Sequence, residues 1–230
     1  MTLALTVGVL GYDPFGPRLA GPALRSWHLA LQLARICHVE LWTEGPAPDP
    51  PGGTNLRIRN FHPELIRGAS AQYAGFLLPA QAALRDRTLF QLDCPVVVDC
   101  YDPFPAETAH LLAGAGRSEQ QFRTRLQAWA SLHAVVHGDY HLVATEAQRG
   151  YLGGLLVATG RLTPGLTHQD RAIPGRTLLV PTGYDPSAVD LIGRGHQGAL
   201  ALLERWGIRV GAGERFLLWS GGLWPWLDPV

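Results

Sequence analysis

Residues 95–107 read PVVVDCYDPFPAE, and this stretch decides the fold class of the chain. Its three valines are β-branched and form a continuous apolar run after a proline, which is typical of a strand covered on both faces inside a parallel sheet. Asp99, Tyr101 and Asp102 follow the valines, and two prolines end the run. Because ligands bind at the carboxyl ends of strands in open α/β sheets, the stretch predicts an α/β protein with polar groups at such a site.

The residues on both sides alternate between strand patterns and helix patterns. Apolar runs and period-two alternation predict further strands at residues 3–10, 38–43, 56–61, 73–78, 141–145 and 177–180. Apolar residues at helical spacing predict helices at 22–36, 63–68, 80–89, 118–137 and 146–159, and the helix at 118–137 should be the longest and end at Gly138. Residues 187–213 favour a helix only in their middle, and residues 216–220 begin another strand. Strands that alternate with helices predict a Rossmann-like parallel sheet with helices on both faces.

The composition is that of an ordinary globular protein with no net charge. A chain of 230 residues lies between one large domain and one domain plus part of a second. Its 19 basic and 19 acidic residues balance, so no basic field predicts a nucleic-acid partner and no polybasic patch predicts binding to anionic lipid. All basic residues are arginine, which excludes lysine-based chemistry.

The cysteines and the N-terminus predict a cytoplasmic protein. Cys37, Cys94 and Cys100 are odd in number and lie in or beside apolar segments, which favours buried free thiols in a reducing compartment over a disulfide or metal site. The apolar residues 3–10 follow no basic residue and are interpreted as a first strand instead of a signal peptide. No segment is long enough to cross a bilayer. Aromatic residues near the first loop are candidates for peripheral membrane contact, although Trp27 lies at core-type helical spacing with Leu24.

Five segments, taken in order, resemble the family 4 glycosyltransferases. They are GPRLAGPALRSWHLALQLA at residues 16–34, PVVVDCYDP at 95–103, LVATEAQRGYL at 142–152, LLVPTGYDP at 178–186 and FLLWSGGLWPWLDP at 216–229. Members of that family have the GT-B fold of two facing Rossmann-like domains. The resemblance covers nearly the whole chain, although each segment alone is weakly specific.

The resemblance implies an enzyme that transfers a sugar from a nucleotide-sugar donor to a glycan or lipid-linked acceptor, with retention of configuration and without a metal or other cofactor. Residues 1–212 would form the N-terminal, acceptor-binding domain of the GT-B fold. Residues 213–230 would form the first strand and turn of a C-terminal nucleotide-sugar domain that is otherwise missing. We therefore expect no transfer by this chain alone, and transfer by a chain extended past Val230.

The first loop and the helix after it supply four candidate substrate-binding residues. The N-terminus of a helix can face a phosphate or carboxylate, and glycines let the backbone approach it. The candidates are Gly16, Arg18, Gly21 and Arg25. Under the alternative interpretation, the glycines only turn the chain and the arginines are solvated surface residues.

Tyr101 and Asp102 are the candidate catalytic residues. Many family members have a His-Asp pair after the corresponding strand, so the tyrosine here is a departure and a histidine role is not transferable. Asp102 is the candidate for a polar contact to the acceptor or sugar. An Asx turn before Pro103 is the alternative explanation of this aspartate.

Four further candidates for substrate binding match the family's segments, namely Glu146, Gly183, Gly221 and Gly222. Glu146 follows Thr145, which is well placed to be the N-cap of the next helix, so capping is the favoured explanation of that pair. The three glycines would lie on either side of the cleft between the domains.

Two other functional hypotheses remain beside the glycosyltransferase. A non-catalytic module that binds a glycan or a partner protein would come from a different class, and it should ignore nucleotide sugars. A nicotinamide-dependent oxidoreductase is disfavoured because Gly8, Gly11 and Gly16 do not have the G-x-G-x-x-G spacing. A metal site at His133, His137 and His141 is also disfavoured, because Gly138 ends the helix before the third histidine.

Overall fold

The computed structural model describes residues 5–15, 21–162, 176–183, 203–209 and 211. The chain divides into two compact units, Met1–Pro181 and Thr182–Val230. In the second unit, residues 203–205 form a helical turn. The prediction of a strand at 216–220 lies outside the described residues, and so does most of the predicted region at 187–213.

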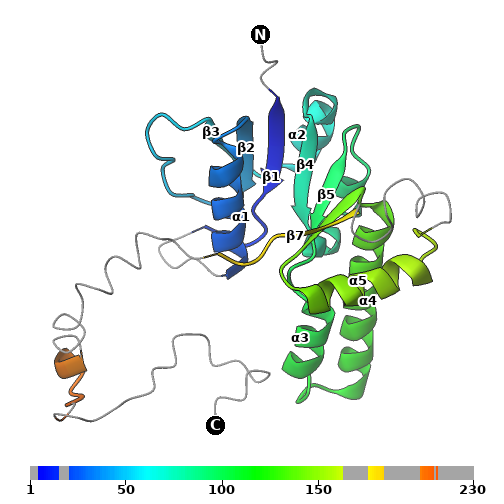
Figure 1. Ribbon diagram of the computed structural model, residues 1–230. Coiled ribbons are helices and arrows are strands. Elements are labelled where there is room, and N and C mark those ends of the chain that lie inside the picture. Colours follow the sequence, from blue (N-terminus) through cyan, green and yellow to red (C-terminus); the bar gives the residue numbers. More distant parts are fainter. Residues whose placement is uncertain (1–4, 16–20, 163–175, 184–202, 210, 212–230) are drawn as a thin grey trace. The chain divides into compact units, whose positions relative to one another are not determined.

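The first unit contains a parallel sheet with the strand order β3-β2-β1-β4-β5-β6-β7 (Figure 1). Its strands are β1 Thr6–Leu10, β2 His38–Thr43, β3 Leu56–Asn60, β4 Gly75–Pro79, β5 Val96–Asp99, β6 Tyr140–Val143 and β7 Thr177–Leu179. Every neighbouring pair is parallel. The α/β, Rossmann-like fold class predicted from the sequence is therefore confirmed, and the valine-rich strand β5 lies inside the sheet.

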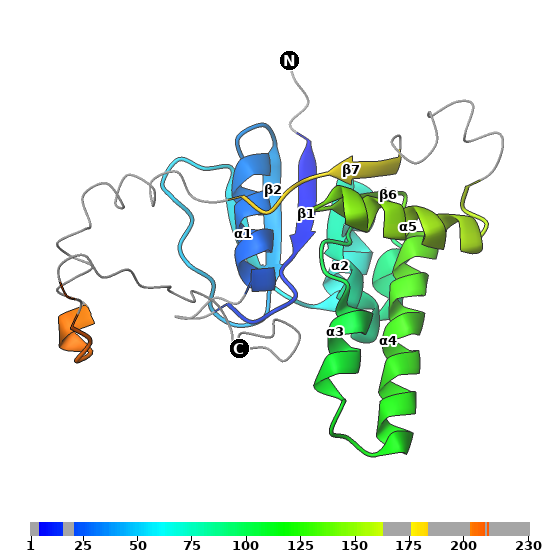
Figure 2. The same ribbon diagram turned by 60° about the horizontal axis from the view of Figure 1, so that its bottom comes forward.

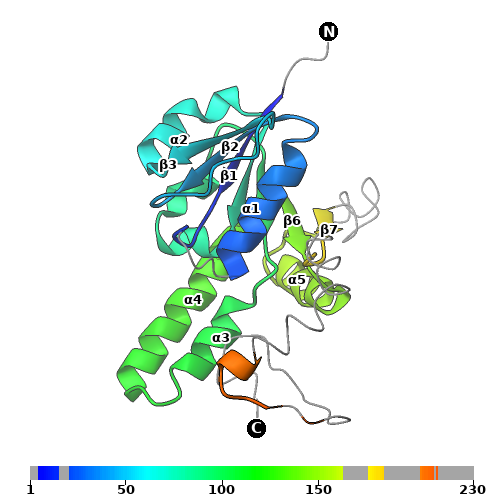
Figure 3. The same cartoon turned by 90° about the vertical axis from the view of Figure 1, so that its left-hand side faces the viewer.

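Helices cover both faces of this sheet (Figure 3). They are α1 Gly21–Leu33, α2 Pro63–Ala69, α3 Phe104–Leu111, α4 Arg117–His137 and α5 Glu146–Ala158, with the 3₁₀ turns η1 Ser70–Gln72, η2 Ala80–Leu84 and η3 Arg87–Phe90. Trp27 and Ala30 of α1 pack on one face, together with Val9. Ile66 of α2 and Ala134 of α4 pack on the other face.

Neighbouring residues of each strand point to opposite faces, which produces two apolar clusters. In β1, Val9 joins the cluster under α1, whereas Leu10 joins the cluster under α2 and α4. Gly8 lies where the ring of Phe76 crosses β1, and a Cβ atom there would come within 2.1 Å of that ring. This close approach explains the glycine inside a strand whose other residues are Thr, Val and Leu.

The helix predicted at residues 80–89 is wrong, because two 3₁₀ turns occupy this stretch. The Asp86 side chain accepts hydrogen bonds from the Thr88 backbone N–H at 2.9 Å and from its hydroxyl at 2.6 Å. The Arg67 guanidinium holds the same carboxylate at 2.7 Å. Aspartate bonded in this way begins a new turn and competes with continuation of an α-helix.

A short helix, α3, follows the loop after β5 and has no counterpart among the predicted elements. Pro105 lies in its first turn, where a backbone N–H would have no partner within the helix, so the N–H that proline lacks is not needed. Together α3 and α4 form a pair of neighbouring helices that extends past the end of the sheet (Figure 2). The prolines after β5 therefore start a helix after ending a strand.

The longest described helix, α4, buries a different face from the one that its large apolar residues mark. Such a stripe ordinarily faces the core, but Phe122, Leu126, Trp129 and Leu132 are exposed by 39% or more. The buried residues are Ala130, Ala134 and Val135. Small side chains let α4 approach η2 and the sheet closely, and this packing fixes its orientation.

Gly138 ends α4 as predicted, but in an extended conformation with φ −69° and not in the left-handed one. A Cβ atom at this position would lie 2.5 Å from a methyl group of Val98 and 2.9 Å from His141. Position 138 therefore needs a glycine because a side chain would not fit there.

Trp27 is buried, whereas Leu24 of the same predicted face is 40% exposed. The three cysteines are free, as predicted, but only Cys94 is buried, whereas Cys37 and Cys100 are partly exposed. Within the described part of the chain, no helix combines the length and the apolar character that crossing a bilayer requires.

Candidate functional site

The site lies where the chain changes direction in the sheet. Strand β1 continues through α1 to β2 on one side, while β4 borders it on the other. In doubly wound sheets this switch point forms a crevice at the carboxyl ends of the strands. Tyr12, Pro22, Pro79 and Tyr101 line a cavity of about 10 Å³ there, which has room for about one water molecule.

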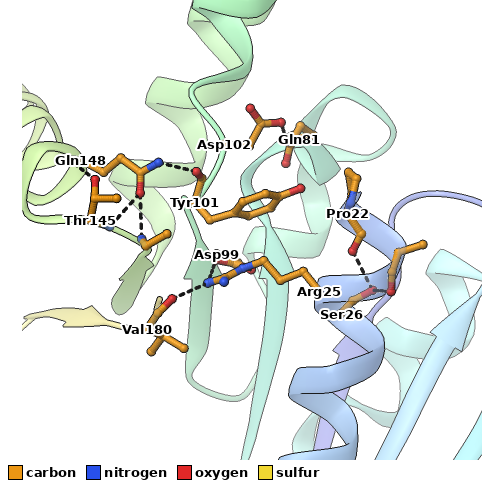
Figure 4. A network of polar contacts seen from close by, with 12 residues as sticks. Pro22, Arg25, Ser26, Gln81, Asp99, Tyr101, Asp102, Thr145, Gln148 and Val180 are labelled. Carbon is orange, nitrogen blue, oxygen red and sulfur yellow. Dashed lines mark hydrogen bonds and ion pairs between the residues drawn. The ribbon is translucent and has the colours of Figure 1, made fainter. Parts of the chain in front are cut away.

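A buried ion pair forms the base of the site (Figure 4). The Arg25 side chain donates to both carboxylate oxygens of Asp99, at 2.6 and 3.0 Å. The exposed fractions of the two side chains are 5% and 7%. Burial raises the pKa of Asp99, while the Arg25 guanidinium opposes that rise.

The same guanidinium holds two further groups. It donates to the carbonyl of Val180 at 3.1 Å, just after β7, and lies 4.8 Å from the centre of the Tyr101 ring. Arg25 therefore joins α1, the end of β5 and the segment after β7. The interpretation of Arg25 as a solvated surface residue is wrong, because Asp99 and Val180 occupy its guanidinium.

Asp102 carries one bonded and one unbonded carboxylate oxygen. Its Oδ2 accepts a hydrogen bond from Gln81 at 2.6 Å, whereas the buried Oδ1 has no partner among the described residues. An Asx turn would bond this side chain to the backbone ahead of it, and the structure contains no such bond here. Burial first, and then the neighbouring Glu107, raise the pKa of Asp102 to about 7.

Two glutamines that the sequence analysis missed form hydrogen bonds to residues of the site. Gln148 accepts from the Thr145 backbone N–H at 3.1 Å and donates to the Tyr101 carbonyl at 2.6 Å. Because Thr145 accepts from the Gln148 N–H in return, the pair forms a capping box. Its T-x-x-Q pattern was the available signal. Gln81 had no such signal, because it lies on η2, where an α-helix was predicted.

A second cavity lies beside Asp102 and has a volume of about 20 Å³. Cys100, Ser131, Gln148 and Tyr151 contribute to its lining. Neither this cavity nor the one beside Tyr12 can enclose a sugar ring. A ligand larger than a water molecule would therefore lie outside these two cavities.

Gly21, Glu146 and Gly183 are the other predicted site residues that the structure describes. Gly21 is exposed at the start of α1, and Gly183 is exposed in the second unit. The Glu146 side chain is 67% exposed and pairs with Arg149 at 3.0 Å, while Thr145 is the N-cap, as predicted. Four predicted residues lie outside the described part of the chain: Gly16, Arg18, Gly221 and Gly222.

The three histidines near the end of α4 have separate surroundings. The rings of His133 and His137 lie 4.3 Å apart, and His133 contacts the Arg87 carbonyl at 3.2 Å. His141 is fully buried on β6. Across the residues that the structure describes, no three metal-ligating side chains form a group that could hold an ion.

Comparison with known proteins leaves the family unassigned: neither protein-family models nor curated protein sequences match this chain.

Proposed function

We propose that this chain is the acceptor-binding, Rossmann-like part of a glycosyltransferase that uses a nucleotide-sugar donor. One observation carries the proposal: at the carboxyl edge of the sheet, the Asp102 carboxyl group has a buried oxygen, Oδ1, that is hydrogen-bonded to no described residue and so is available to a ligand hydroxyl. The ordered series of segments that resembles family 4 glycosyltransferases supports it. Two of these segments, which contain Arg25 and Asp102, meet at this edge.

The chemistry assigned to Asp102 is the orientation of an acceptor hydroxyl. In the transfer, the hydroxyl oxygen forms a bond to the anomeric carbon while the bond from that carbon to the phosphate oxygen of the donor breaks, and the hydroxyl proton passes to the departing phosphate. A carboxyl group with a pKa of about 7 can accept the hydroxyl hydrogen bond in its ionised form. Gln81 fixes the other oxygen, and Oδ1 is the oxygen that is left to accept a hydrogen bond from the hydroxyl.

Saccharide binding by the 230-residue chain tests the proposal. We expect a glycan panel to contain a saccharide that binds saturably, and Asp102→Asn to weaken its binding by about tenfold, since one hydrogen bond to a charged group is lost. The control is Asp93→Asn, which removes an exposed carboxylate before β5, at the opposite edge of the sheet. A folded chain that binds no saccharide, or equal effects of the two substitutions, would contradict the proposal.

The non-catalytic binding module is the second candidate, and the small volumes of the two cavities favour it over an enclosed active site. Titration with UDP- and GDP-sugars separates the two candidates. A glycosyltransferase extended past Val230 should bind one of these donors and transfer its sugar. A binding module should bind the saccharide and ignore every donor.

A further inference from the structure

Arg85 is a second cation at the carboxyl edge, and two aromatic rings hold it. Its Cζ lies 4.4 Å from the centre of the Tyr12 ring and 6.0 Å from that of Phe61. Tyr12 follows β1, Phe61 follows β3, and Arg85 caps the end of η2. The faces of aromatic rings attract a guanidinium and limit its movement. Three segments that follow strands therefore position one positive charge.

The ion pair that Arg85 makes is exposed, unlike that of Arg25. Its Nη1 lies 2.5 Å from Glu44, whose side chain is 44% exposed. Glu44 is the only ion-pair partner of Arg85 among the described residues. Exposed pairs of this kind contribute about 0–1 kcal/mol. A ligand that offers a better acceptor can therefore displace Glu44 at little cost.

Arg85 belongs to the same region as Asp102. Its 3₁₀ turn, η2, also carries Gln81, which bonds Asp102 at 2.6 Å. Asp13 interacts electrostatically with both residues. The charge of Arg85 opposes the rise in the pKa of Asp13, and the charge of Asp13 raises the pKa of Asp102. Arg85 thus caps the same turn whose Gln81 holds Asp102, which puts the two residues in one region of the carboxyl edge.

We propose that Arg85 binds a phosphate group of the ligand, in exchange for the carboxylate of Glu44. A guanidinium can donate two parallel hydrogen bonds to a phosphate, and these bonds are stronger than those to a single carboxylate oxygen. The rings of Tyr12 and Phe61 keep the guanidinium in place during the exchange. The inference rests on the proposed function in one respect: the phosphate would belong to the acceptor, which makes a phosphorylated acceptor the preferred substrate class.

Calorimetric titration of the chain with inorganic phosphate and with glucose 6-phosphate tests this proposal. We expect Arg85→Ala to weaken binding of both probes by at least about tenfold, and Arg85→Lys to weaken it less. Glu44→Gln should tighten binding by about threefold or more, because the competing carboxylate is gone. The proposal would be overturned if either substitution left the affinity for the two probes unchanged. It would also be overturned if Glu44→Gln bound neither probe.

The matched controls are Arg123→Ala and Glu119→Gln. These residues form another exposed ion pair, 3.1 Å long, on α4, so the controls change the net charge equally. Their dissociation constants should stay within about twofold of the wild-type value, since screening weakens distant surface charges. Equal effects at both pairs would mean that only net charge matters, and would overturn the proposal.

The two proposals fail separately. Binding of glucose and of glucose 6-phosphate with equal affinity would overturn the role of Arg85 and leave saccharide binding in place. If the chain bound phosphate but no saccharide, saccharide binding would be overturned and the role of Arg85 would stand.

Discussion

At the level of single residues, the burial of a charge decides what it can do. Arg25 lies at a helix start where a phosphate-binding arginine is expected, but its bonds to Asp99 commit it to the fold. Removing one partner of a buried pair of this kind typically costs about 3–5 kcal/mol, because the other charge is left unpaired. The Arg85 side chain is 25% exposed and pairs with the 44% exposed Glu44, so its ion pair, unlike that of Arg25, is accessible to solvent.

His141 should make the stability of the protein depend on pH. Burial lowers its pKa to about 4, from 6.5 in an unfolded chain. At this site the unfolded state therefore binds more protons between these values, so the contribution of His141 to the free energy of unfolding should fall by about 3 kcal/mol as the pH drops from 6.5 to 4. The raised pKa of Asp102 acts in the opposite direction over the same range, because the folded state holds that proton more tightly. Urea denaturation at a series of pH values measures this slope.

Substitution of His141 by leucine should remove this part of the slope, because leucine does not titrate. The exposed His28 provides the matched control, and His28→Gln should retain the wild-type dependence. An unchanged slope in His141→Leu would assign the pH dependence to other groups. The charges near the His141 ring are those of Arg161 and Arg176.

Among the elements, α4 shows most clearly that packing overrides local pattern. Its apolar stripe should contribute little to stability, since Phe122 is 67% exposed, whereas Val135 is 1% exposed. We expect Phe122→Ser to change the free energy of unfolding by less than about 0.5 kcal/mol, and Val135→Ala to lower it by more than about 1 kcal/mol. Urea denaturation of both variants provides the comparison. A larger loss in Phe122→Ser would show that the stripe is covered.

For the whole molecule, the buried clusters predict where folding is autonomous. The three apolar clusters among the described residues lie within Met1–Pro181. Residues 1–181 alone should therefore unfold in one cooperative transition, with a urea m-value close to that of the main transition of the full chain. Circular dichroism during urea titration measures it. A gradual transition would mean that residues after Pro181 complete the core.

The carboxyl edge could be predicted in outline, and its polar contacts could not. Asp99 and Asp102 were placed at a strand end because a run of valines stops there. The partners Gln81 and Arg85 come from η2, and the sequence pattern gives this turn the wrong type. Their contacts depend on η2 ending at Arg85 and on the strand order, neither of which is encoded in local spacing.

The sequence by itself determined the parallel sheet, the ends of α4 and the N-cap of α5 at Thr145, because hydrophobic period and cap residues act over a few neighbours. Only the tertiary structure decided that Arg25 forms a buried ion pair and which face of α4 is buried. Arg25 and Asp99 are 74 residues apart, and their ion pair exists because the fold removes both from water together. The pKa of Asp102 has the same origin, since burial by other elements is its largest cause.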